Sequence, residues 1–252
     1  MKSFSRILLS LLFAAWALPA VCAGQDSRPD EELQGDIAVL GIPVGKGSVQ
    51  IWNNETWEGH PARRIVAKGE TVGLISLFYR VNDTMESFCD PQSSQTYLFR
   101  VHFEEGKYRR NQEYRFDQAD GMIKGTHGSE LKMMPPTYDP LAAIMYIRSA
   151  DLREGMVLSG NVSDGRQVYR MEAVVPKKEM KSVLGRRMPC WVVEPRMDPV
   201  KLGGILNNEK FRKFTAWMTA DQERILVLAK GDLFFGALAA RLQKREVKPS
   251  SK

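Results

Sequence analysis

Apolar and polar residues alternate along most of the chain, and this period of two is typical of β-strands with one buried and one solvated face. The clearest example is a hairpin at 97–117, in which every second residue of the returning strand is polar. Further hairpins are predicted at 156–175 and 214–228, and shorter strands at 37–44, 48–53, 63–68 and 190–194. Strands joined mostly as hairpins predict a mainly β fold with one antiparallel sheet, sandwich or barrel.

One segment breaks the alternation and predicts a helix. Asp139 is suited to cap a helix, Pro140 fits its first turn, and residues 141–147 are apolar on nearly every side. A helix without a polar face must be buried. We therefore predict a curved antiparallel sheet, or open half-barrel, wrapped around a buried apolar helix at about 140–149. A further helical turn is expected within 71–79, and a long loop at 125–136.

The N-terminus has the three parts of a secretory signal peptide. Lys2 and Arg6 precede an apolar run at 7–18, and small residues follow up to Ala23 and Gly24, between which we expect cleavage. The run is about a dozen residues long, whereas a membrane-spanning helix needs about 20. Three regions are predicted: a signal peptide at 1–23, a single β-rich domain at 24–242 and a basic disordered tail at 243–252.

This leader predicts a soluble periplasmic protein with no transmembrane span after cleavage. Cys22 raises the alternative of a lipoprotein. Lipid attachment requires a small residue directly before the cysteine and an aliphatic residue three positions before it. The chain has Val21 and Pro19 there, so we do not expect lipidation.

The formal net charge of +6 is concentrated at the two ends of the chain. Lys2 and Arg6 leave with the signal peptide, and residues 241–252 carry five cations against Glu246, so the body at 24–240 is neutral. Nucleic-acid binding requires cations clustered on a folded face, and we expect none. A solvated tail, or weak attraction of that tail to anionic lipid headgroups, explains the charge.

Two cysteines, Cys89 and Cys190, remain in the mature chain. An oxidising compartment permits a disulfide between them, which would close a loop of about 100 residues. Nothing in the sequence places the two residues near each other, and buried single thiols are common. A bridge and two free thiols are therefore both open.

No pattern indicates catalysis, so we predict a protein that is not an enzyme, with no catalytic residues, no metal ligands and no cofactor. His60, His102 and His127 are scattered, Ser129 lacks the Gly-x-Ser-x-Gly context of a nucleophile, and neither phosphate-binding glycine motif occurs. Ligand-binding residues are not identified. One set of aromatic residues either lines a pocket for an acyl chain or fills the core: Trp57, Tyr97, Phe99, Phe103, Phe116, Tyr146, Trp191 and Trp217.

Several short motifs follow one another along the chain: Ile42-Pro43-Val44-Gly45, Trp57-Glu58-Gly59, the hairpin from Tyr108-Arg109 to Phe116-Asp117, Asp139-Pro140-Leu141-Ala142-Ala143, Leu152-Arg153-Glu154-Gly155, Val193-Glu194-Pro195, and Ala216-Trp217-Met218 to Arg224-Ile225. In sequence and order they resemble the bacterial family known as domain of unknown function 3108, and the resemblance covers roughly residues 35–242. It implies an exported protein of Gram-negative bacteria. The architecture is also loosely similar to periplasmic lipoprotein carriers, in which a half-barrel surrounds a helix and an apolar cavity. Shape alone does not fix function.

Together these features favour a non-enzymatic periplasmic envelope protein that binds an apolar, lipid-like ligand in the concave face of its sheet. The alternative is a structural or partner-binding envelope protein with a filled core and no small-molecule ligand. Expected partners are lipid or envelope proteins, and the sequence indicates no oligomeric state. Apolar space of several hundred cubic ångströms is typical of a small-molecule site, whereas a densely packed core favours the alternative.

Overall fold

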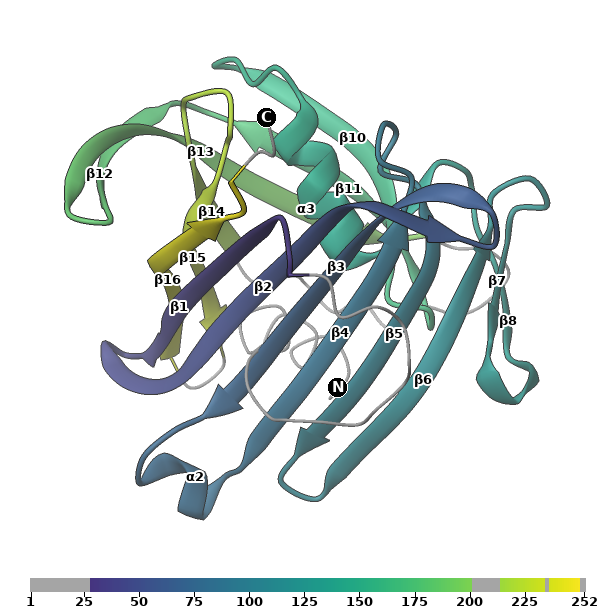
Figure 1. The fold of residues 1–252 in the computed structure, drawn as a ribbon, viewed down its shortest axis with the longest axis horizontal. Coiled ribbons are helices and arrows are strands. Elements are labelled where there is room, and N and C mark those ends of the chain that lie inside the picture. Colours follow the sequence, from purple (N-terminus) through teal and green to yellow (C-terminus); the bar gives the residue numbers. More distant parts are fainter. Residues whose placement is uncertain (1–27, 201–213, 234–235, 250–252) are drawn as a thin grey trace.

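The alternating segments form one large sheet of sixteen strands in the computed structural model, which describes residues 28–200, 214–233 and 236–249 (Figure 1). Its first part is a meander of consecutive strands: β1 (Glu31–Val39), β2 (Ile42–Trp57), β3 (His60–Thr71), β4 (Val81–Cys89), β5 (Thr96–Glu105), β6 (Tyr108–Asp117), β7 (Met122–Gly125) and β8 (Glu130–Lys132). This part forms one half of the curved sheet.

The second part joins the first through an antiparallel pairing of β1 with the last strand, β16. From that seam the order continues through β15, β14, β13, β11 and β10 to β9, and β12 pairs with β13 at the side. The bounds are β9 (Thr137–Tyr138), β10 (Met156–Ser163), β11 (Val168–Val175), β12 (Lys178–Val183), β13 (Arg186–Pro199), β14 (Phe214–Thr219), β15 (Leu226–Leu233) and β16 (Gly236–Val247). All pairs are antiparallel except β9 with β10, and the path ends at β8 and β9 without closing, which confirms the predicted curved, open sheet.

The three predicted hairpins are confirmed as β5–β6, β10–β11 and β14–β15. The predicted strand at 37–44 is wrong, because the chain turns at Leu40 and Gly41, which have φ angles of 52° and 82°. The predicted loop at 125–136 also contains structure, since it holds a 3-10 turn (Thr126–Gly128) and β8.

The predicted disordered tail at 243–252 is wrong for residues 243–247, which belong to β16. There Lys244 lies opposite Gln34 of β1, and Arg245 lies opposite Leu33. Charge alone suggested a solvated end, but each cation has an anionic partner. The Lys244 ammonium lies 2.5 Å from Glu246, and Arg245 pairs with Glu31 and Glu223.

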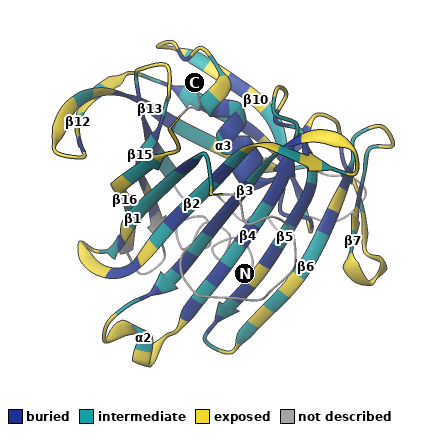
Figure 2. Cartoon of the chain, viewed as in Figure 1, coloured by how far each residue is buried: buried dark blue, intermediate teal, exposed yellow. Residues whose placement is uncertain are grey.

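The predicted buried helix is confirmed as α3 (Pro140–Ser149), which packs against β3, β4, β9 and β10. Figure 2 shows the helix largely in the colour of buried residues, inside the curve of the sheet. A single-turn helix, α2 (Ile75–Phe78), follows β3 within the segment where a helical turn was expected. None of the helices in the described ranges is long and apolar enough to cross a bilayer.

Asp139 caps α3 as predicted, and its carboxylate is completely buried. One oxygen accepts hydrogen bonds from the backbone N–H groups of Leu141 and Ala142, at 2.8 and 3.1 Å. The other accepts from the hydroxyl groups of Ser87 on β4 and Thr96 on β5, at 2.5 and 2.7 Å. Burial raises the pKa of Asp139, and these four donors oppose that shift. The cap therefore also attaches the helix to two strands.

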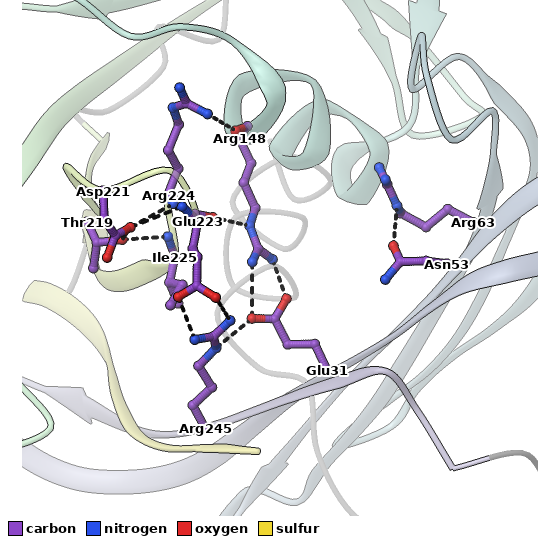
Figure 3. A network of polar contacts seen from close by, with 10 residues as sticks. All are labelled: Glu31, Asn53, Arg63, Arg148, Thr219, Asp221, Glu223, Arg224, Ile225 and Arg245. Carbon is purple, nitrogen blue, oxygen red and sulfur yellow. Dashed lines mark hydrogen bonds and ion pairs between the residues drawn. The ribbon is translucent and has the colours of Figure 1, made fainter. Parts of the chain in front are cut away.

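A second polar group, the Glu31 cluster, holds the other end of α3 (Figure 3). It comprises Glu31 on β1, Arg148 on α3, Arg245 on β16 and Glu223 in the β14–β15 turn. The Glu31 carboxylate lies 2.6 Å from Arg148 and 2.8 Å from Arg245, and Arg245 lies 2.7 Å from Glu223. Burial raises the pKa of Glu31, but the hydrogen bonds and charges of the two arginines outweigh it and hold the pKa below its usual value.

Removing the cap should destabilise the whole fold. We expect Asp139→Ala to lower the free energy of unfolding by about 2–4 kcal/mol, because it leaves two helix N–H groups and two buried hydroxyl groups without their acceptor. Asp139→Asn keeps one acceptor oxygen and should cost less. Urea denaturation of both variants measures the difference, and equal stability of Asp139→Ala and the wild type would contradict the role of the cap.

The Glu31 cluster predicts a pH-dependent contribution to stability. Since the folded-state pKa of Glu31 lies below the usual 4.5, its ion pairs stabilise the fold above pH 4.5 and are lost as pH falls through the folded pKa. Glu31→Gln should lower the free energy of unfolding by about 2–3 kcal/mol at pH 7, and this deficit should shrink below pH 4.5. Glu246→Gln, in an exposed pair on β16, is the control and should change stability much less than Glu31→Gln at pH 7.

Candidate functional site

An apolar hollow lies between α3 and the inner face of the sheet at the β1–β16 seam. Its volume is about 120 Å³, and α3 contributes Leu141 and Ile144 to its wall. Ile144 is only partly buried, whereas its neighbours Ala143 and Met145 are buried. The hollow is thus the place where the helix does not fill the space enclosed by the sheet.

The hollow exists because the strands beneath it carry small residues at inward positions. Gly35, Gly47, Ala67, Ala229 and Ala240 all line it, and we call them the small-residue floor. They lie on neighbouring strands in the order β15, β16, β1, β2 and β3, with Gly35 directly opposite Gly47 and Ala229 directly opposite Ala240. Larger side chains at these positions would fill the space below Ile144.

Gly35 also has a purely structural reason to be glycine. A Cβ atom at this position would lie 2.6 Å from the backbone oxygen of Arg241, at the irregularity in the β1–β16 pairing. The close approach of two backbones excludes any side chain there. Among the floor residues, the alanines are therefore the positions that substitution can test.

The size of the hollow limits what it can bind. Pockets for drug-sized ligands measure about 300–1,000 Å³, whereas a dry apolar cavity of about 150 Å³ accepts benzene. A hollow of 120 Å³ can therefore take only a few carbon atoms. Its lining carries few polar groups that could orient a ligand, so it suits the end of an alkyl chain.

A larger groove of about 540 Å³ lies beside β6 and is polar. Arg109, Arg110, Ser129 and Arg166 contribute to its lining. Its most buried cation, Arg110, already donates hydrogen bonds to the Tyr114 hydroxyl and the backbone oxygen of Asp164, at 2.9 and 3.0 Å. The groove therefore does not provide a free buried charge for a ligand.

The histidines do not converge on a site. His60 begins β3, His102 lies on the exposed side of β5 with Nε2 3.8 Å from Glu104, and His127 lies in the 3-10 turn next to exposed Ser129. The described ranges contain no group of three or more His, Cys, Asp or Glu residues that could hold a metal ion. Asp139 is completely buried, but its carboxylate faces the N-terminus of α3 and serves as the cap of that helix.

The eight aromatic residues that could line a pocket or fill the core lie in several separate clusters. Phe99, Phe103, Phe116 and Trp191 belong to the main core around α3, and Trp217 belongs to a separate cluster with Cys190. The remaining three are partly buried: Trp57 packs on Phe88 with ring centroids 5.0 Å apart, Tyr146 stacks on Tyr138 at 4.7 Å, and Tyr97 lies beside His60. None of them lines the hollow, whose defining residues are the small ones that sequence patterning did not single out.

Cys89 and Cys190 are free thiols in this structure, so of the two alternatives, a disulfide and two free thiols, it contains the second. The two residues lie in different clusters, Cys89 in the main core and Cys190 with Trp217 and Val192. Burial raises the pKa of Cys89 to about 12 and also raises that of Cys190. The expected cleavage site at Ala23 and Gly24 and the signal peptide at 1–23 lie outside the described residues.

Comparison with known proteins identifies relatives by family and by fold. Residues 34–243 match the family model described as "Protein of unknown function (DUF3108)". No curated protein is significantly similar in sequence. A beta-barrel-like protein of domain of unknown function DUF1849 from Brucella abortus has a TM-score of 0.60 at 11% identity, over 88% of this chain and 99% of that one.

Two further solved structures are more distant. A protein with a YmcC-like fold from Bacteroides fragilis matches with a TM-score of 0.35 at 10% identity, over 87% of this chain and 96% of that one. A DUF1089 family protein from Pseudomonas aeruginosa has a TM-score of 0.31 at 11% identity, over 84% and 95%. The Brucella structure supports the fold, and none of these likenesses carries a function.

The thiols give a direct test of the cysteine environment. In the native protein, neither Cys89 nor Cys190 should react with Ellman's reagent within minutes at pH 8, because both are buried and their pKa values are raised. Both should react after unfolding in guanidinium without a reductant. Fewer than two reactive thiols after unfolding of the mature protein purified from a periplasm would show that they are oxidised.

Proposed function

The chain belongs to the DUF3108 family of proteins of unknown function, and we propose that it is a non-enzymatic envelope protein that holds the end of an acyl chain. The observation that carries this proposal is the hollow between α3 and the small-residue floor. A hollow lined mainly by apolar side chains of a helix and a sheet offers dispersion contacts to an alkyl chain and favours its transfer from water.

Export to the periplasm is part of the same proposal. It is supported by the three-part leader at 1–23, with the cut between Ala23 and Gly24. An envelope protein meets acyl chains continually, so an apolar hollow in such a protein has an available ligand. The remainder of a lipid would lie outside the hollow, which is too small to enclose it.

The small volume of the hollow favours a second candidate, a structural or partner-binding envelope protein without a small-molecule ligand. The helix and the main core already fill most of the space inside the sheet, and 120 Å³ is below the range of ordinary ligand pockets. A structural or partner-binding envelope protein would need no more space than this. The two candidates differ in one respect, which is whether an alkyl chain binds.

Native mass spectrometry of mature protein purified from a periplasm without detergent should detect a lipid bound in one-to-one ratio. After removal of that lipid, isothermal titration with a single-chain dodecyl phospholipid below its critical micelle concentration should give saturable binding. A protein that co-purifies with no lipid and binds none in the titration would favour the partner-binding candidate.

Two substitutions locate the binding. Ala67→Leu adds a side chain to the floor and should weaken binding at least about tenfold, because it occupies much of the hollow. Ile144→Ala enlarges the hollow and should preserve or strengthen binding. Ala62→Leu is the matched control, since Ala62 lies on the same strand but in the separate cluster with Phe88 and Leu98. Loss of binding in Ala62→Leu with Ala67→Leu unaffected would place the ligand elsewhere.

A further inference from the structure

The end of the sheet at which β3 leads into β4 carries a group of exposed apolar side chains. In the β3–β4 connection, the exposed fractions of Leu74, Leu77 and Phe78 are 76%, 78% and 87%. In the neighbouring β1–β2 turn, Leu40 and Ile42 are 66% and 63% exposed. Figure 2 shows both turns in the colour of exposed residues at the same end of the molecule, and we call these five residues the apolar rim.

The rim is held in place by hydrogen bonds at its base. The Thr71 hydroxyl donates to the backbone oxygen of Tyr79 and accepts from the N–H of Val81, both at 3.0 Å, so it joins the two ends of the connection. The N–H of Val72 donates to the oxygen of Val44 at 3.0 Å and links the two turns. Leu74, Leu77 and Phe78 are therefore exposed on a turn whose base is fixed, and α2 itself has no buried residue.

Cations surround the rim. Lys46, Arg80 and Lys107 are exposed, and the Gly106 N–H donates to the oxygen of Arg80 at 2.8 Å, which places the Lys107 turn beside the β3–β4 connection. Acidic residues also lie close to two of these cations. Glu104 pairs with Arg109 at 3.4 Å, Glu105 is buried, and Glu70, whose pKa is raised by burial, lies close to both Lys46 and Arg80. Asp36 is exposed and lies opposite Lys46 on the neighbouring strand.

We propose that the apolar rim inserts into the surface of a bilayer that contains anionic lipid. Projecting turns with large apolar side chains need no complementary surface to become buried in lipid, whereas a stable protein interface needs about 800 Å² of matched surface on each partner. Lys46, Arg80 and Lys107 are placed to meet headgroup phosphates while Leu77 and Phe78 enter the acyl boundary. This surface is separate from the hollow, so the inference stands without the proposed acyl binding.

Vesicle flotation with the mature protein tests the inference. The wild type should float with vesicles of phosphatidylethanolamine and phosphatidylglycerol, and the double variant Leu77→Ser, Phe78→Ser should partition at least about tenfold less. Met180→Ser, Leu184→Ser is the matched control, because these residues are about equally apolar and 51% and 48% exposed on the distant β12–β13 hairpin. The inference is overturned if the wild type does not float or if the rim variant floats as well as the control.

Two further measurements separate rim contact from general adhesion. The emission of a Phe78→Trp protein should shift to the blue on vesicle addition and be quenched by brominated lipid more than that of the mature wild type, which has four tryptophans at 52, 57, 191 and 217. Lys46→Glu, Lys107→Glu should weaken binding to anionic vesicles at low salt and have little effect on zwitterionic ones. A protein that floats while the emission of Phe78→Trp stays unchanged binds through another surface, which would also overturn the inference.

Discussion

The antiparallel pairing of β1 with β16 is the contact on which the architecture depends. It runs from Glu31 opposite Val247 to Val39 opposite Leu238, and it joins the meander β1–β8 to the rest of the sheet. Its strands are separated by about 200 residues, and the Glu31–Arg245 hydrogen bond spans 214 positions. Closing a loop of this length costs about 5 kcal/mol of conformational entropy beyond a constant, and this cost grows only slowly with loop length. The hydrogen bonds and buried side chains of a full ladder have to offset it.

The seam and the helix constrain each other. Arg148 joins the C-terminal end of α3 to Glu31, and Asp139 joins its N-terminal end to Ser87 and Thr96. Each attachment depends on a buried acidic side chain, Glu31 or Asp139, and removing one partner of a buried polar contact costs more than the contact contributes. The helix is therefore held at both ends by polar contacts and along its length by the side chains that it buries in the main core, whereas Ile144 stays only partly buried above the floor. The hollow is the space between Ile144 of α3 and the alanine and glycine residues of the floor, whose side chains are too small to fill it.

How much the sequence could predict depended on whether a residue's signal was local. The hairpin at 97–117 and the helix at 140–149 were predicted because alternation, a capping Asp139 and Pro140 lie within one segment. Strand β4 was missed because its inward positions include Asp83 and Ser87, which interrupt the apolar pattern. The end of β16 was missed because the partners of Arg245, which are Glu31 and Glu223, lie outside the local segment. The small-residue floor could not be predicted, since it is assembled from five strands whose register is not encoded locally, although glycine inside the strand-like segments was a partial signal.

The hollow and the apolar rim lie at different positions along β1 and β2, and buried side chains pack between them. On β1, Ile37 lies between Gly35 of the floor and the Leu40 turn, and on β2, Val44 lies between Gly47 and Ile42. Ile37 and Val44 belong to one buried cluster with Val81, Ala229 and Leu238. This cluster separates the hollow from the rim along the described strands. An acyl chain that reached the hollow from a bilayer held at the rim would have to displace these close-packed side chains or pass along another path. Membrane contact and chain binding are therefore physically separable, and a variant that loses one should be able to retain the other.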